Sequence, residues 1–415
     1  MINQDRSVAA VFSSRAFPLL LLSAAALIPA CNDPGRAPSP EVPPNPIVDT
    51  AVDAVTGAVA DAVADALVTD PTADFAGLDE GWNAVSPGGD TQCSDGSDYR
   101  FFVRPGAHDK LMFYLEGGGA CWSGLNCDPT LRPTYQVNLA ATDPASAHGV
   151  LAFQQPANPL RDYTVVYAPY CSGDVHLGDA EQHYPVPAIG DRGASEVNIQ
   201  HRGWVNASAA LAWIRDHIPA PRQIFVTGSS AGSIPSPFYA VELADQYPEA
   251  AVVQLGDGSG GYRGFANFDP YEVWNLDEVV ARLPNIGALS GDEFGFQHLY
   301  LGAAEANSGI RFASYDNAED DVQKQFLTLG GAPASSLQPL LEMNLAEISA
   351  AVPGFRYYVA GGAMHTILLR PEVYTYEVGG VRFVDWLGDL VRGDDVENVM
   401  CSDCGAAPGA DSPGQ

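Results

Sequence analysis

One stretch of this 415-residue chain reads Ile224-Phe225-Val226-Thr227-Gly228-Ser229-Ser230-Ala231-Gly232. Its first four residues are apolar or β-branched and predict a buried strand, and a segment of helical character follows the second glycine. A Gly-x-Ser-x-Gly turn between a strand and a helix is the pattern of a nucleophile elbow, in which the serine has a strained backbone conformation. The spacing of the glycines selects Ser230, rather than Ser229, as the nucleophile.

Short runs rich in β-branched and aromatic residues recur on both sides of this turn. We predict strands at Tyr99–Val103, Leu111–Leu115, Thr164–Ala168, Gln223–Thr227, Ala251–Leu255, Ile310–Tyr315 and Arg356–Ala360. Between the third and fourth runs, one helical face would carry Trp204, Ala207, Leu211 and Ile214. Strands that alternate with helices predict a mostly parallel sheet covered on both faces, in an α/β-hydrolase-type fold. Ligands bind at the carboxyl ends of the strands in such sheets.

The charge of the chain excludes some classes of partner. It has 20 basic and 51 acidic residues, which give a formal charge of −31. Nucleic acid and anionic membrane surfaces are repelled by such a charge, so we expect neither as a partner. The same repulsion disfavours a strongly polyanionic substrate, whereas the acidity itself helps to keep an exported protein soluble.

The N-terminus has the pattern of an export signal. Basic residues precede an apolar run from Phe17 to Ile28, which is too short to span a bilayer comfortably. The segment that ends at Cys31 resembles a bacterial lipoprotein processing site. Two outcomes stay open, namely lipid attachment at Cys31, which would tether the protein to a membrane, and cleavage by an ordinary signal peptidase. In both cases we expect an exported protein, either secreted or held at the cell surface.

Composition divides the chain into four parts. We predict a signal peptide at residues 1–31, a Pro/Ala/Asp-rich linker at 32–76, a catalytic domain at 77–404 and a flexible tail at 405–415. The hydrophobic content of 46% is enough to fill the core of one large domain. We expect this domain to be monomeric.

Seven cysteines are an odd number, but six remain if Cys31 is a lipid anchor. The six are Cys93, Cys121, Cys127, Cys171, Cys401 and Cys404. An even set in an exported chain is typical of disulfides. Zinc binding by Cys401 and Cys404 is the alternative, which is disfavoured because no second cysteine pair or histidine lies near them in the sequence.

A serine nucleophile needs a base, and in this fold the acid and then the histidine follow the serine along the chain. Only His298 and His365 come after Ser230. His365 follows directly after a predicted strand, where a loop can hold an imidazole over the sheet. His298 lies in a helical, aromatic segment and is expected to pack or to line a pocket. We therefore predict His365 as the base.

Four aspartates compete for the role of the acid that orients this base. Asp316 comes at the carboxyl end of a predicted strand and is our choice. Asp320 and Asp321 stand where a solvated helix would begin. Asp257 follows the strand after the nucleophile and would instead support the elbow.

The oxyanion hole is expected from the backbone after Ser230 and from a loop after an earlier strand. Residues 115–120 read Leu-Glu-Gly-Gly-Gly-Ala and follow such a strand. Consecutive glycines let backbone N–H groups approach a tetrahedral oxygen without obstruction by side chains. A phosphate-binding loop is disfavoured, because no Lys and Ser/Thr follow the glycines.

Several blocks together resemble the pectin acetylesterase family, which includes Notum-like serine carboxylesterases. In chain order they are Leu-Glu-Gly-Gly-Gly-Ala-Cys at 115–121, Pro-Tyr-Cys-Ser-Gly-Asp-Val at 169–175, Gly-Ser-Ser-Ala-Gly at 228–232 and Tyr-Asp at 315–316. The resemblance runs from about Gln92 to His365. Gly119 is a departure, because Notum-like members have an aromatic residue at this position.

The resemblance implies a triad of Ser230, Asp316 and His365. It implies oxyanion donors from Gly118, Gly119 and Ala231, and substrate-cleft positions for Trp122, Asp174 and His176. It further implies disulfides Cys93–Cys171 and Cys121–Cys127, so that Cys401 and Cys404 would pair by elimination.

We therefore expect an esterase that works through an acyl-enzyme, without a metal or an organic cofactor. The expected substrate is a small or carbohydrate-borne acyl ester, with acetate as the acyl group. A lipid or acyl-protein carboxylesterase is the close alternative. A surface-anchored binding protein that has lost turnover is an alternative from another class of function.

Overall fold

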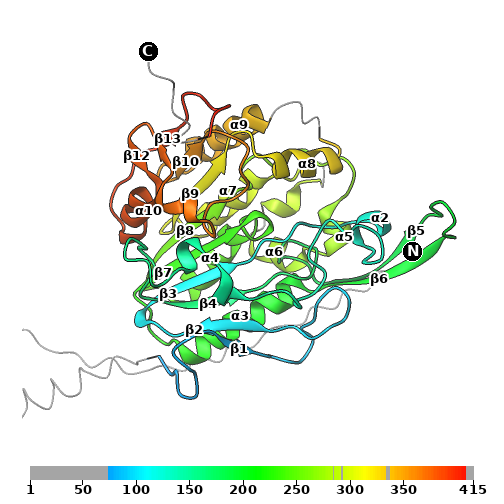
Figure 1. Cartoon of the computed structure of the whole chain (residues 1–415), viewed down its shortest axis with the longest axis horizontal. Coiled ribbons are helices and arrows are strands. Elements are labelled where there is room, and N and C mark those ends of the chain that lie inside the picture. Colours follow the sequence, from blue (N-terminus) through cyan, green and yellow to red (C-terminus); the bar gives the residue numbers. More distant parts are fainter. Residues whose placement is uncertain (1–72, 284, 291–292, 333–336, 408–415) are drawn as a thin grey trace, which may run out of the picture. The chain divides into compact units, whose positions relative to one another are not determined.

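A computed structural model describes residues 73–283, 285–290, 293–332 and 337–407 (Figure 1). The chain divides into two units, Met1–Leu67 and Val68–Gln415, and all described residues belong to the second. The predicted signal peptide, Cys31, nearly all of the predicted linker and residues 408–415 of the predicted tail lie outside the described residues. Within the described ranges, no helix is long and apolar enough to cross a membrane.

A large, mostly parallel sheet forms the centre of the described domain. In spatial order its strands are β1 (Asn83–Val85), β2 (Phe101–Arg104), β4 (Tyr163–Ala168), β3 (Ala107–Leu115), β7 (Gln223–Ser229), β8 (Ala251–Asp257), β9 (Arg311–Asn317), β10 (Arg356–Ala360) and β13 (Val399–Met400). The pairs β1–β2 and β2–β4 are antiparallel, and the other pairs are parallel. All seven predicted strands are present, and the predicted α/β-hydrolase-type fold is confirmed.

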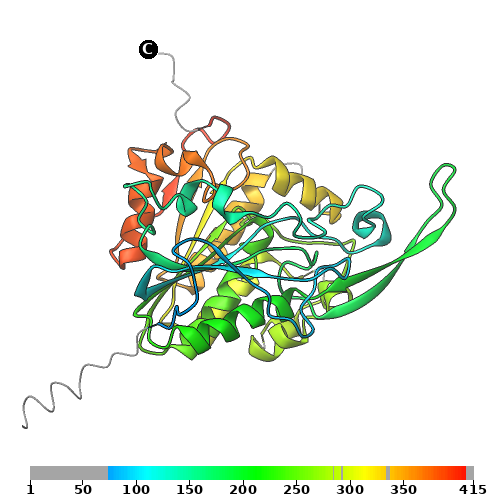
Figure 2. The ribbon, with the colours of Figure 1, turned by 60° about the horizontal axis from the view of Figure 1, so that its bottom comes forward.

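Helices cover both faces of this sheet, as the alternation of strands and helices predicts (Figures 1 and 2). One face packs against α3 (Gly203–His217), α4 (Ser236–Gln246), α7 (Phe296–Ala306) and α9 (Leu337–Ala351). The other packs against α10 (Phe383–Arg392) and the 3₁₀ turns η2 (Gly149–Leu151) and η5 (Pro371–Tyr374). Side chains of β3 alternate between the two cores: Leu111 and Phe113 face the first, and Met112 and Tyr114 face the second.

The remaining elements lie in the connections between strands. They are α2 (Gly124–Cys127), α5 (Pro270–Trp274), α6 (Asp277–Arg282), α8 (Asp321–Leu329), the 3₁₀ turns η1 (Pro144–Ser146), η3 (Ser230–Gly232) and η4 (Ile286–Ala288), and the strands β5 (Ala180–Val186), β6 (Ser195–His201), β11 (Glu377–Val378) and β12 (Val381–Arg382). The hairpin β5–β6 was not predicted, because many of its side chains are polar and exposed. It extends away from the sheet (Figure 2).

The register of the parallel strands brings distant segments to one edge. Leu115 of β3 pairs with Gly228 of β7, and Ser229 of β7 pairs with Asp257 of β8. On the other side of β8, Asp257 pairs with Tyr315 of β9. The predicted oxyanion loop, the elbow and the aspartate-bearing turns therefore leave the sheet side by side.

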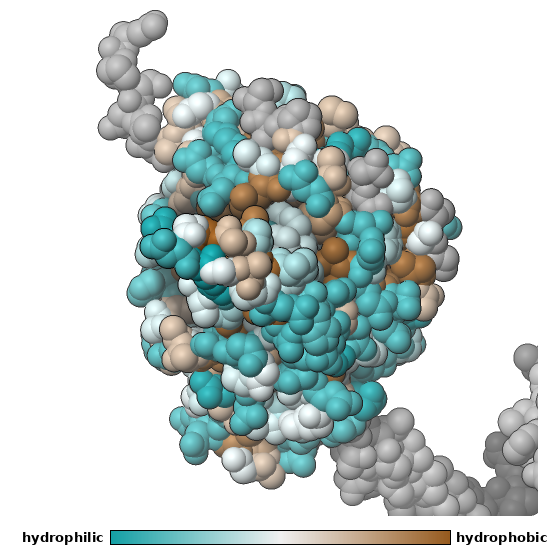
Figure 3. Space-filling model, turned by 90° about the vertical axis from the view of Figure 1, so that its right-hand side faces the viewer, coloured by the Kyte–Doolittle hydropathy of each residue, from teal (hydrophilic) through white to brown (hydrophobic). Residues whose placement is uncertain are grey.

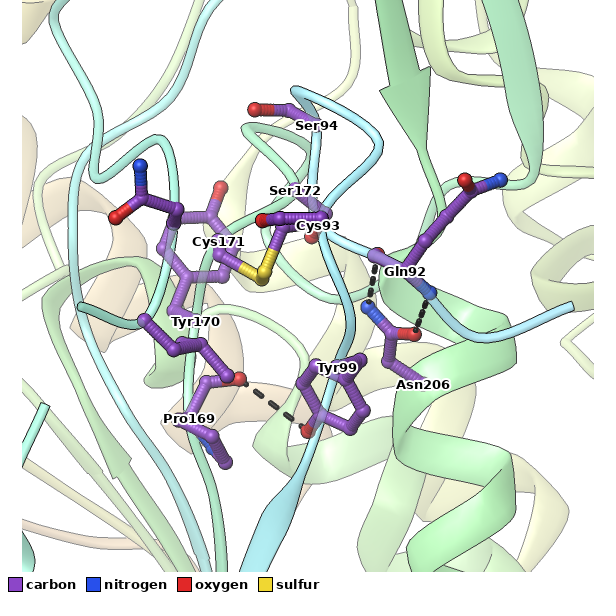
Figure 4. Close-up of a disulfide and its surroundings, with 12 residues drawn as sticks. Gln92, Cys93, Ser94, Tyr99, Pro169, Tyr170, Cys171, Ser172 and Asn206 are labelled. Atoms are coloured by element: carbon purple, nitrogen blue, oxygen red, sulfur yellow. Dashed lines mark hydrogen bonds between the residues drawn. A yellow bond between two sulfur atoms is a disulfide. The ribbon is translucent and has the colours of Figure 1, made fainter. Parts of the chain in front are cut away.

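Three disulfides confirm the predicted pairings: Cys93–Cys171, Cys121–Cys127 and Cys401–Cys404. The zinc alternative is therefore wrong, because the sulfurs of the last pair are bonded to each other. Figure 4 shows the first disulfide, which joins the segment before β2 to the segment after β4. Beside it, Gln92 exchanges two hydrogen bonds of 3.0 and 2.9 Å with Asn206 of α3. The disulfide thereby fixes the segment after β4, which supports the oxyanion loop.

Candidate active site

Ser230 stands at the turn between β7 and η3 with a φ of +55°, in the left-handed region that few non-glycine residues adopt. The two glycines of the motif permit this turn. A Cβ on Gly228 would lie 2.3 Å from the carbonyl oxygen of Gly232, and a Cβ on Gly232 would lie 2.1 Å from that of Leu115. Both contacts are too short for any side chain, so only glycine fits at these two positions. The close approach of β3 is one reason, and the geometry of the predicted elbow is confirmed.

The glycine-rich loop after β3 lies against this serine. A Cβ on Gly117 would come within 2.9 Å of the Ser230 Cβ. Gly119 has a φ of +80°, and a Cβ there would lie 2.0 Å from the Thr134 carbonyl oxygen. No hydrogen bond to a described residue is recorded for the backbone N–H groups of Gly118 and Gly119. The loop therefore presents unused donors near the nucleophile, as an oxyanion hole requires.

Buried polar groups hold this loop from behind. Glu116 accepts a hydrogen bond of 2.9 Å from the backbone N–H of Tyr170, and burial raises the pKa of its carboxyl to about 7. His176 donates from Nε2 to the Glu116 carbonyl oxygen at 2.8 Å. Burial lowers the pKa of His176 to about 4, which keeps the ring neutral at physiological pH. Glu116 and His176 thus support the oxyanion loop.

The structure pairs His365 with Asp320. The Nδ1 of His365 donates to Oδ2 of Asp320 at 2.7 Å. The other oxygen of Asp320 accepts from the backbone N–H groups of Val322 and Gln323, so the same carboxylate caps α8. Asp320 is fully buried. An imidazole held in this way has its Nε2 available for the serine.

No hydrogen bond between the described residues Ser230 and His365 is recorded, and Nε2 of His365 is buried without a partner. Their segments nevertheless adjoin each other through the loop after β8. Ser259 donates to the Ser230 carbonyl oxygen at 2.6 Å, and a Cβ on Gly258 would lie 2.9 Å from Thr366 Cγ2. Catalytic hydrogen bonds are often long in free enzymes and tighten when substrate binds.

The structure does not pair the predicted acid, Asp316, with His365. Its Oδ1 accepts from the Gly260 N–H at 2.7 Å and from Gln323 Nε2 at 3.1 Å, and its Oδ2 has no partner among the described residues. Burial, with a smaller contribution from Asp320, raises its pKa to about 8. Asp316 is therefore mostly protonated at neutral pH and does not contact His365.

The reason is the path of the chain after β9. Ala318 donates to the Ala360 carbonyl oxygen, Glu319 to that of Gly362 and Asp321 to that of Ala363. These bonds run the turn alongside the loop that leads to His365, so the fourth residue after Asp316 meets the imidazole. The predicted helix start is nevertheless correct, because α8 begins at Asp321.

Of the three predicted cleft positions, one lines the cavity and two do not. Trp122 lines the cavity next to Ser230. Asp174 does not, because its buried carboxylate accepts from Ser172 Oγ and from the Gly203 and His176 N–H groups. Burial raises the pKa of Asp174 to about 6. The structure therefore places neither Asp174 nor His176 in the wall of this cavity: Asp174 holds the backbone of Gly203 and His176, and His176 holds that of Glu116. His298 lies on α7, where its Nδ1 accepts from the Gly295 N–H.

An apolar cavity opens at the nucleophile. Ser230, Ala231 and Gly119 form part of its wall. Aromatic side chains form much of the rest, among them Trp122, Phe265, Phe268, Trp274, Phe294 and Phe326. The rings of Trp122 and Phe268 stack with centroids 4.4 Å apart. Among the described residues no charged side chain lines this cavity. Figure 3, which looks onto the side that bears the hairpin, shows apolar side chains in recesses between polar ones.

One group of potential metal ligands occurs in the described part of the chain. Atoms of Cys121, Cys127 and His201 lie within 4.8 Å of one another. The two sulfurs form a disulfide, and both ring nitrogens of His201 are in hydrogen bonds, to Ser172 and Tyr184. This group therefore has no ligand atom left for a metal ion.

Two comparisons with known proteins show what the chain is similar to. The model of the family described as Pectinacetylesterase matches residues 83–275, a range that includes the oxyanion loop and the elbow and ends before Asp320 and His365. Palmitoleoyl-protein carboxylesterase NOTUM of Schmidtea mediterranea is 31% identical over 93 residues, which are 21% of this chain. The match covers 18% of the length of that relative. Residues 83–275 of the chain are thus similar to the pectinacetylesterase family.

Proposed function

We propose that the protein is a serine carboxylesterase whose substrates carry an apolar acyl chain longer than acetyl. The observation that carries this proposal is the aromatic cavity, whose wall includes Ser230 and, from the oxyanion loop, Gly119 and Ala120. A carbonyl carbon at Ser230 Oγ would place its acyl chain against these rings. The family match and the carboxylesterase relative support hydrolysis of acyl esters as the reaction class.

The chemistry follows from the roles of the side chains. Ser230 Oγ attacks the ester carbonyl carbon while its proton passes to His365 Nε2. Asp320 orients the imidazole and stabilises the imidazolium that forms. The N–H groups of Gly118, Gly119 and Ala231 donate to the oxyanion. The imidazolium then protonates the leaving alcohol, and water repeats the sequence on the acyl-enzyme, which releases the acid and restores Ser230.

The cavity favours a longer chain over acetate for an energetic reason. Each methylene group that leaves water for an apolar site contributes about 0.8 kcal/mol, whereas acetate has only one methyl group to bury. The apolar surface of these rings is larger than the single methyl group of an acetyl ester can cover. Acetyl ester hydrolysis, which the sequence led us to expect, is the second candidate and is favoured by the description of the matched family.

A series of p-nitrophenyl esters separates the two candidates. We expect kcat/KM to rise at least about tenfold from the acetate to the octanoate, because part of the burial energy is used in the transition state. The variant Ile234→Trp fills the cavity wall and should reduce turnover of the octanoate but spare the acetate. Leu329→Trp, at an exposed site on α8, is the matched control. A wild-type preference for the acetate would favour the second candidate.

Labelling with a fluorophosphonate tests whether the site is catalytic at all. The proposed enzyme forms a covalent adduct on Ser230, and Ser230→Ala abolishes it. A binding protein that has lost turnover should not react there. Absence of an adduct on the folded wild-type protein would therefore exclude the esterase.

The cellular setting belongs to the same proposal. Three disulfides among the described residues fit an oxidising compartment, which supports export. We propose a monomeric protein that is secreted or tethered through a lipid on Cys31. Metabolic labelling with a fatty-acid probe, with and without Cys31→Ser, distinguishes these two forms.

A further inference from the structure

Asp257 is a buried carboxylate that the proposed mechanism does not use. It ends β8 and is fully buried. One of its oxygens accepts from Ser229 Oγ at 2.7 Å. The same carboxylate accepts from the backbone N–H of Ile367 at 3.0 Å and from that of Leu368 at 3.0 Å. Asp257 therefore joins two segments that are more than a hundred residues apart in the sequence.

The residues that Asp257 holds are the neighbours of two strained positions. Ser229 directly precedes Ser230, which has a φ of +55°. Ile367 directly follows Thr366, a β-branched residue with a φ of +60°. Thr366 in turn follows His365. Such conformations persist only where the surrounding structure fixes them. One carboxylate thus fixes the backbone next to the nucleophile and next to the base.

A third group extends this arrangement into the core. The hydroxyl of Tyr114 lies 2.7 Å from Ser229 Oγ. Because Ser229 gives its proton to Asp257, the Tyr114 hydroxyl is the donor in this contact. The result is a chain of hydrogen bonds from Tyr114 through Ser229 to Asp257, and all three residues are buried. Ser229 is thereby assigned a role that its place in the motif does not reveal.

We propose that Asp257 is a positioning residue of the esterase, which sets the nucleophile and the base in register through Ser229 and the Ile367–Leu368 backbone. This inference rests on the proposed function, because it concerns the rate at which Ser230 reacts. Loss of the link should therefore slow acylation without weakening substrate binding.

The matched control lies on the same strand. Gln254 of β8 is also fully buried and hydrogen-bonded, but its amide donates to Ser236 and Tyr300 on the helical side. Gln254→Ala therefore removes a buried polar group of β8 without touching Ser229 or the histidine loop. Comparison of Asp257→Ala with Gln254→Ala, each measured below its own unfolding temperature, separates positioning from stability.

The assay measures the rate of fluorophosphonate labelling of Ser230, together with kcat and KM for p-nitrophenyl butyrate. We expect Asp257→Ala to slow labelling and lower kcat by about 100-fold with little change in KM, because small misplacements of reacting groups have effects of this size. Asp257→Asn keeps one acceptor oxygen for the loop and should restore much of the rate. Ser229→Ala should be slower than wild type, and the Ser229→Ala/Asp257→Ala double variant no slower than Asp257→Ala alone.

Several results would overturn the assignment. One is labelling of Asp257→Ala at the rate of Gln254→Ala, and another is multiplication of the two single effects in the double variant. If Asp257→Ala does not fold, a wild-type labelling rate in Ser229→Ala would overturn it. Failure of the proposed function is distinct, because then the wild-type protein itself does not label at Ser230.

Discussion

Exchange of Asp320 for asparagine tests the acid of the triad. Asparagine keeps an oxygen at the position that accepts from Val322 and Gln323, and it is as good an N-cap as aspartate, so α8 should stay intact. The change removes the negative charge 2.7 Å from His365 Nδ1. An amide at this position can stabilise the wrong tautomer and cannot stabilise the imidazolium.

The expected loss in kcat is about 10⁴-fold, or about 5 kcal/mol of transition-state stabilisation, if Asp320 has the role of the acid in a serine triad. Asp316→Asn is the matched control. Its retained oxygen still accepts from Gly260 and Gln323, and the new amide group replaces an oxygen without a partner. We expect this variant to retain activity within about tenfold of wild type.

Steady-state hydrolysis of p-nitrophenyl butyrate by both variants gives kcat and KM, and circular dichroism verifies that they fold. The reasoning is refuted if Asp316→Asn is the inactive variant and Asp320→Asn turns over near the wild-type rate. That result would mean that the turn after β9 rearranges in the working enzyme and that the family position supplies the acid.

Three further predictions concern stability and the oxyanion loop. Burial raises the pKa of Asp316 to about 8 in the folded protein, whereas in the unfolded chain it is near 4. The stability that the protonated carboxyl contributes is therefore complete below about pH 4 and is lost as the pH rises towards 8. Asp316→Asn should therefore raise the unfolding temperature relative to wild type more at about pH 8 than at about pH 5, and an equal effect at both would contradict the burial of a neutral carboxyl. Gly119→Ala should lower kcat by about 10²-fold or more, because its Cβ would lie 2.0 Å from the Thr134 oxygen and displace an oxyanion donor; unchanged kcat in steady-state assays would remove Gly119 from the hole. Removal of Cys93–Cys171, which closes a loop of 78 residues, should cost about 4 kcal/mol in urea unfolding, about twice the cost of removing Cys121–Cys127 with its separation of 6. Equal losses would argue against an effect of loop length.

Local patterns predicted the fold and the elbow well, because their causes are local. The strand before Gly228 is apolar, and the glycines on both sides of Ser230 are needed where β3 approaches within the reach of a Cβ. The position of His365 after β10 follows from the same rule that loops at the carboxyl ends of strands carry the chemistry. The resemblance implied two of the disulfide pairings and elimination gave the third, and all three agree with the structure.

The hydrogen-bond partner of His365 was missed because tertiary pairing decides it. Asp316 and Asp320 are both near the end of β9, and only the hydrogen bonds between residues 318–321 and 360–363 show which carboxylate meets the imidazole. The pattern at Asp320 indicated a helix cap, which is correct, but one carboxylate can cap a helix and bind a histidine with its two oxygens. Asp174 and His176 look like site residues in a motif and instead hold the backbone of other segments, Asp174 that of Gly203 and His176 that of Glu116.

A crystal structure of the fluorophosphonate adduct tests the central claim most directly. It should show phosphorus bonded to Ser230 Oγ, its oxygen within hydrogen-bonding distance of the Gly118, Gly119 and Ala231 N–H groups, and His365 bridging from Nε2 at the adduct to Asp320 at Nδ1. An adduct on another residue, or His365 bonded to a different carboxylate, would contradict it.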